Sequence, residues 1–118
     1  MQLAAGDNFL ITCDGSHRIL MRYTWDAFSK VWITENRSGD LPVGKPNNKP
    51  FITAANKHYA VLDYDSQSSD GRRNPLTLYY QDSDNHWQTG ASTTLAFTIG
   101  VTAQKAALVL PVARRLSH

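Results

Sequence analysis

The chain has 118 residues, enough for one domain, and 42% of them are hydrophobic while 19% are charged, the composition of a globular protein. Its net charge of +2 is too small, and its basic residues too scattered, to indicate a nucleic acid or an acidic membrane surface as the partner. No stretch approaches the roughly 18 apolar residues that a membrane-spanning helix needs.

Two features bear on the cellular compartment. Residues 1–6 lack the basic segment and the apolar core of a signal peptide, so none is predicted in this chain. Cys13 is the single cysteine, which excludes an internal disulfide but not secretion, since many secreted β proteins have none. We expect Cys13 to be a small buried residue of a strand. The compartment is left open.

The apolar residues of the first half alternate over short distances, which is typical of strands. Turn-forming residues separate these strands, because Gly15 tolerates a positive φ and aspartates bond their own backbone. The first half is therefore predicted to be a three-stranded meander followed by a loop rich in Gly, Pro and Asn. Its strands cover residues 9–13, 17–25 and 30–35, and its loop covers residues 36–49.

The second half follows the same order with one enlarged turn. Residues 65–75 form a turn about seven residues longer than its counterpart, and insertions in repeat proteins concentrate in loops of one face, often the binding face. Strict alternation from Thr93 predicts a further, separate strand. Residues 50–53 open this half, and the predicted strands are residues 58–63, 76–81, 86–89, 93–99 and 106–112.

These halves are copies of one another. Residues 4–12 are echoed by residues 54–62 and again from Ala103, a period of about 50 residues that is typical of propellers and repeat arrays. Residues 19–23 are answered by residues 76–80, and Trp32 by Trp87. The predicted units are residues 1–49, 50–93 and a partial 94–118.

We therefore expect an all-β, propeller-like fold of repeated antiparallel meanders. About two and a half units cannot close a ring of four to eight blades. The chain is then expected to be a fragment of a longer protein, to complete the ring as a homo-oligomer, or to pack its two units as a sandwich.

Aromatic residues stand at corresponding places in both full units, and two interpretations of them are open. They can fill the packing between units, or they can form platforms on which sugar rings stack, supported by nearby polar groups. The second interpretation predicts two equivalent sites. One consists of Trp87 and Tyr80 with Asp82 or Asp84, and the other consists of Trp32, Tyr23 and Asp26.

The sequence contains no recognisable catalytic or metal-binding pattern. It has no Gly-x-Ser-x-Gly, no Gly-rich phosphate loop and no histidines at metal-ligand spacing, so no catalytic residue, metal or cofactor is predicted. Residues 63–71 alternate oxygen ligands but fit a solvated turn better than a calcium loop. A glycoside-acting enzyme would need a carboxylate pair, drawn from Asp63, Asp65, Asp82 and Asp84, yet these residues lie in polar turns.

Two families share parts of this pattern. An Ala followed by an apolar run, a strand ending in Tyr, and then Trp-x-Thr resembles the β-propeller repeats of Rhs/YD toxin-complex and teneurin-like proteins, over residues 5–34 and 55–89. Residues 76–81 with Trp87 also resemble the blades of small fucose-binding propeller lectins. Those lectins pair an Arg with a Glu in each sugar site; Arg22 is present, and its counterpart in the second copy is Tyr79. Neither resemblance implies an enzyme.

The sequence favours a non-catalytic binding or scaffolding module that uses the loops at residues 38–48 and 65–75. Its expected partner is a protein or a carbohydrate. A lectin-like propeller is the alternative, and a glycoside-acting enzyme is the second alternative.

Overall fold

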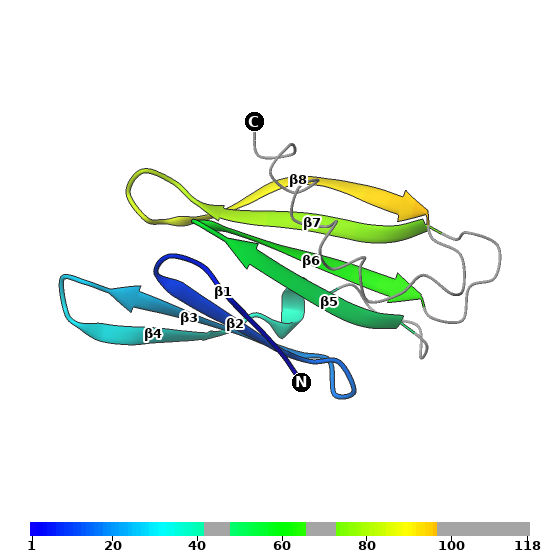
Figure 1. Cartoon of the computed structure of the whole chain (residues 1–118), viewed down its shortest axis with the longest axis horizontal. Helices are drawn as coiled ribbons and strands as arrows, with labels where there is room; N and C mark the ends of the chain where they lie inside the picture. The colour runs from blue at the N-terminus through cyan, green and yellow to red at the C-terminus, as the bar shows by residue number, and fades with distance from the viewer. Residues whose placement is uncertain (42–47, 66–72, 97–118) are drawn as a thin grey trace.

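The computed structural model describes residues 1–41, 48–65 and 73–96, which form two open, four-stranded antiparallel sheets (Figure 1). Within each sheet every strand pairs with the next one along the chain, so both sheets are meanders. The all-β prediction is confirmed, and the described residues contain no α-helix. Sheet A consists of β1 (Gln2–Ala5), β2 (Phe9–Asp14), β3 (Ile19–Asp26) and β4 (Val31–Asn36), followed by the short 3₁₀ helix η1 (Ser38–Asp40). Sheet B consists of β5 (Asn48–Ala55), β6 (His58–Asp65), β7 (Arg73–Gln81) and β8 (Trp87–Ala96).

Two strands differ from the prediction. β1 adds a fourth strand to the first meander, because Gln2–Ala5 pairs along β2. β8 runs unbroken from Trp87 to Ala96, where two separate strands were expected. A register shift between Thr77 and Tyr79 lets β8 stay paired with β7 along its whole length. The expected strand at residues 106–112, most of the partial third unit and most of the enlarged turn lie outside the described residues.

The two sheets stack face to face, and aromatic residues fill the space between them. The Phe9 ring lies 4.9 Å from the Trp87 ring and 5.9 Å from the Tyr59 ring, centroid to centroid. Tyr59 in turn stacks on Tyr79 at 4.9 Å. The core cluster is formed by Phe9, Ile11, Cys13, Leu20, Leu41, Ile52, Tyr59, Val61 and Tyr79.

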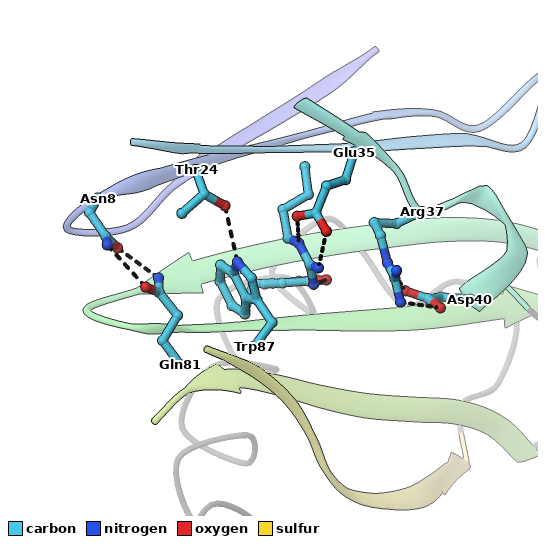
Figure 2. Close-up of polar contacts among 9 residues, drawn as sticks. Asn8, Thr24, Glu35, Arg37, Asp40, Gln81 and Trp87 are labelled. Carbon is cyan, nitrogen blue, oxygen red and sulfur yellow. Dashed lines mark hydrogen bonds and ion pairs between the residues drawn. The ribbon is translucent and has the colours of Figure 1, made fainter. Parts of the chain in front are cut away.

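Polar contacts fix the two sheets at both ends of the stack. The Gln2 side chain donates to the Pro50 carbonyl and accepts from the Ile52 amide, so it acts like an extra backbone pair between β1 and β5. At the other end, the amides of Asn8 and Gln81 bond reciprocally at 3.0 and 2.7 Å (Figure 2). These contacts hold the relative position of the sheets, and with it the geometry of everything between them.

Gly6 lies where the β1–β2 turn meets sheet B, and it leaves no room for a side chain. A Cβ there would overlap the Phe9 ring and come within 2.5 Å of the Asn56 carbonyl oxygen. That carbonyl is fixed because it accepts a hydrogen bond from the Asp7 amide.

We expect Gly6→Ala to lower the free energy of unfolding by about 1–3 kcal/mol, the usual effect of overpacking. Urea unfolding measures it. Gly39→Ala is the matched control, because nothing lies within 4 Å of the added Cβ. An equal loss in both variants would show that crowding at the sheet interface is not the cause.

Candidate functional site: a groove between the two sheets

Two adjoining hollows lie where the β3–β4 turn of sheet A faces the β7–β8 turn of sheet B. Their volumes are about 510 and 340 Å³, and they share Thr24, Ile33, Asn85 and His86. We call their union the inter-sheet groove. It is lined by Asn8, Arg22, Thr24, Trp25, Asp26, Ala27, Phe28, Ile33, Glu35, Asp84, Asn85, His86 and Trp87.

An aspartate at the start of each turn shapes the rim of the groove. Asp26 accepts hydrogen bonds from the Ser29 hydroxyl and the Phe28 amide, and these lower its pKa. Asp82 accepts from the backbone amides of His86 and Asp84 and from the Gln88 side chain, which likewise lowers its pKa. Both carboxylates are thus held ionised as turn caps. They fix the turns that present Phe28 on one side and Asp84 on the other.

A charged cluster forms one wall of the groove. Arg22, on the sheet-B side of β3, is 4% exposed and makes a bidentate pair with Glu35 of β4 at 2.8 and 2.9 Å. Its guanidinium also donates to the Tyr59 hydroxyl at 3.2 Å and lies 4.5 Å from the centre of the Trp87 ring. Figure 2 shows Glu35 reaching from sheet A toward the Trp87 side. The Trp87 indole of sheet B donates to the Thr24 hydroxyl of sheet A at 3.0 Å, and this bond holds the indole in position against sheet A.

The electrostatics of this cluster fix its protonation state. The hydrogen bond from Arg22 lowers the pKa of Glu35, while burial raises the pKa of Tyr59 to about 12. Glu35 is therefore a carboxylate and Tyr59 a neutral phenol at neutral pH. Three of the five guanidinium N–H bonds of Arg22 go to Glu35 and Tyr59, and the described residues accept none of the other two. The wall therefore consists of a nearly buried guanidinium, a partly exposed carboxylate and an indole.

The structure separates the sequence-predicted site residues. Trp87, Asp84 and Asp26 line the same groove. Asp82 lies behind Asp84 as a turn cap. The remaining predicted residues point elsewhere: Tyr80 lies on the opposite face of sheet B from Trp87, and Trp32 and Tyr23 lie on the face of sheet A away from sheet B.

Sequence reasoning missed Arg22 with Glu35 as a pair, and it missed Phe28. A signal for Arg22 was present, because it occupies an inward position of β3 between Leu20 and Thr24. The alignment of the repeats was also off by one residue. Arg22 lies four residues before the turn aspartate Asp26, and Leu78 lies four residues before the equivalent Asp82. Leu78, not Tyr79, is therefore the counterpart of Arg22. Sheet B therefore has no second arginine at that position.

The carboxylates considered for a glycoside-acting enzyme do not gather across the groove. Asp63 is buried and forms an ion pair with Arg18 at 3.3 Å. It lies on β6 five residues from His58, the end of β6 nearest the β7–β8 turn. At strand spacing, Asp63 is therefore about 16 Å from that end. The side chain of Asp65 lies outside the described residues. Asp82 and Asp84 share one turn, and the low pKa of Asp82 does not suit a general acid.

Other reactive or ligating groups are engaged in the fold. Asp82, Asp84 and His86 place one ligand atom each within 4.8 Å of one another, but one oxygen of Asp82 already accepts hydrogen bonds from turn amides and the other accepts from the Gln88 side chain of β8. We assign no metal to this turn. Cys13 is buried as expected, and burial raises the pKa of its thiol to about 11, which keeps it a thiol at neutral pH.

No known protein family, curated protein or solved structure matches this chain. The resemblance to toxin-complex and teneurin-like repeats and to fucose-binding lectins therefore stays a prediction. Among the helices of the described part, none is long and apolar enough to cross a membrane.

The lowered pKa of Glu35 makes a testable contribution to stability. A carboxyl group whose pKa is lower in the folded state stabilises the fold at pH values above its ordinary pKa, which is 4.5 for Glu35. This contribution is lost as the pH falls through the pKa of the folded state. Because a third of the Glu35 side chain is exposed, we expect the contribution to be about 1 kcal/mol.

Urea unfolding at pH 7 and pH 3 measures this contribution in the wild type and in Glu35→Gln. The variant should lose less stability on acidification, by about 1 kcal/mol, although Asp14, Asp26 and Asp82 also have lowered pKa values and will keep part of the pH dependence. Identical acid sensitivity in both proteins would contradict the role of Glu35.

Proposed function

We propose that this protein is a non-catalytic binding module that takes a saccharide in the inter-sheet groove. The observation that carries the proposal is the combination, in one groove, of aromatic surface with polar groups. Phe28 and Trp87 supply the aromatic surface, and the Arg22–Glu35 pair and Asp84 supply the polar groups. Sugar rings need both, since their C–H faces pack on aromatic rings while their hydroxyls need oriented donors and acceptors.

The size and rigidity of the groove also suit a small ligand. Its larger hollow of about 510 Å³ lies within the range of small-molecule sites. Trp87 and Arg22 are held by hydrogen bonds and by each other, so little ordering is needed on binding. The resemblance to fucose-binding lectins implies an Arg–Glu pair in each sugar site, and Arg22 with Glu35 is such a pair.

The wider proposal, in which the loops at residues 38–48 and 65–75 bind a protein partner, remains, but nothing in the described residues of these loops favours it. Its binding loops, at residues 38–48 and 65–75, fall mostly outside the described residues. The saccharide proposal is therefore the sharper of the two.

A glycan array followed by calorimetric titration with the free sugars of any hits tests the proposal. We expect Phe28→Ala to weaken binding about tenfold or more, equivalent to about 1.4 kcal/mol, because the ring is 98% exposed at the rim and its loss should not disturb the core. Trp32→Ala is the control, since it removes an exposed aromatic ring from the other face of sheet A.

The two variants should therefore differ. If no glycan binds, or if Trp32→Ala weakens the binding of free sugar as much as Phe28→Ala does, the groove is not the saccharide site. Asp84→Asn provides a second variant at the opposite rim, and we expect it to weaken the same sugars.

A further inference from the structure

The two turn aspartates allow the sheets to be compared residue by residue. Asp26 ends the third strand of sheet A and Asp82 follows the third strand of sheet B, and each caps its turn through the amide two residues ahead. The residue before each aspartate pairs with a tryptophan of the fourth strand, Trp25 with Trp32 in sheet A and Gln81 with Trp87 in sheet B. Trp32 and Trp87 are therefore equivalent positions on equivalent faces of the two sheets.

These equivalent faces have different surroundings. The Trp87 face of sheet B is packed against sheet A, where Trp87 contacts Phe9 and Tyr59. The Trp32 face of sheet A points away from sheet B and is open, with Trp32 50% and Leu3 69% exposed. Sheet A thus presents, uncovered, the kind of face that sheet B buries. The sheets stack with non-equivalent faces in contact, as units of a repeat array do.

The open face of sheet A is apolar and carries almost no charge. Its residues are Leu3, Ala5, Leu10, Thr12, Asp14, Ile19, Met21, Tyr23, Trp25, Trp32, Thr34 and Asn36, which include no Lys, Arg or Glu. Leu3, Ile19, Trp25 and Trp32 are exposed, and the half-buried Leu10, Met21 and Tyr23 lie between them on the same face. Asp14, at the edge, is bound to His17.

We propose that this face binds the same face of a second copy of the chain, in a two-fold symmetric dimer. The complement in a head-to-tail array would be the far face of sheet B, but its residues Ala60, Leu62, Leu76 and Leu78 are already fully buried within the chain. A face with almost no charge meets its own copy without repulsion, as an isologous contact requires.

The expected dimer is weak. A four-stranded face of strands about six residues long covers roughly 20 by 20 Å. This is less than the roughly 800 Å² per partner of a stable complex, so we expect dissociation in the micromolar range. Apart from Trp25 at its rim and the β3–β4 turn, the sheet-A residues of the groove lie on the other face of the sheet, so each dimer would present two grooves.

Sedimentation velocity of the full chain across a concentration series tests the proposal. We expect a monomer–dimer equilibrium in the wild type. Trp32→Lys and Leu3→Lys should each weaken dimerisation at least tenfold, because each places an unpaired charge in an apolar interface. Phe28→Lys is the control, since it charges an exposed apolar position outside this face and should dimerise like the wild type.

Circular dichroism shows whether each variant remains folded. If Trp32→Lys does not fold, Leu3→Lys still tests the proposal. Three results would overturn the proposal: a monomer at every concentration, a dimer that both lysine variants retain, and a trimer or longer assembly. The last would indicate head-to-tail contacts or pairing through the free edge of β4.

Discussion

Replacing Phe9 by Ala is expected to lower the free energy of unfolding by about 3–5 kcal/mol, the largest effect of any substitution considered for this protein. Phe9 is 2% exposed and lies between the two sheets, in ring contact with Tyr59 and Trp87. Removing the ring leaves a cavity at the junction of both sheets, and the hydrogen-bonded residues around it have little freedom to collapse into it.

Urea unfolding followed by tryptophan fluorescence measures the loss, because Trp87 reports on the same contact. Phe28→Ala is the matched control. It removes an identical ring that is 98% exposed, so its stability should stay within about 0.5 kcal/mol of the wild type. A loss below about 1 kcal/mol in Phe9→Ala would mean that the two sheets are not held together by this core.

Replacing Arg22 by Met is expected to lower the free energy of unfolding by about 2–4 kcal/mol. Breaking a buried ion pair typically costs about 3–5 kcal/mol, and the partial exposure of Glu35 reduces that value. The variant leaves the Glu35 carboxylate unpaired and removes the guanidinium that bonds the Tyr59 hydroxyl. It also removes the cation from the Trp87 ring.

Arg37→Met is the matched control for this substitution. Arg37 makes the same bidentate pair with Asp40 at 2.9 and 3.0 Å (Figure 2), but both side chains are partly exposed, so the expected loss is below about 1 kcal/mol. Equal losses in the two variants would show that burial of the Arg22 pair is not what makes it important.

Much of the fold could be predicted because its signals are local. The alternation in β2 and β3 and the turn residues Asp14, Gly15 and Asp26 marked the strands and turns of sheet A. β1 and the unbroken β8 were not predicted, since a short strand and a bulged strand depend on pairing with a neighbour rather than on their own residues.

The candidate site was harder to predict because it forms between the sheets. Trp87, Asp84 and Asp26 were chosen from the sequence, but Tyr80 was wrongly expected beside Trp87. Trp87 pairs with Gln81, and Tyr80, the residue before Gln81, points to the opposite face of the sheet. The pairing of Arg22 with Glu35 depends on the register of β3 with β4, and its contacts with Tyr59 and Trp87 depend on how two sheets dock. A sequence does not state either of these directly.

The most direct test of the saccharide site follows the three indole N–H signals in a two-dimensional ¹H–¹⁵N NMR titration with a glycan that binds on the array. Trp87 lies in the groove with its N–H bonded to Thr24, whereas the Trp32 indole lies on the other face of sheet A. We expect the Trp87 signal to shift in proportion to bound sugar while the Trp32 signal stays in place. A shift of Trp32 with an unchanged Trp87 signal would contradict the proposed site.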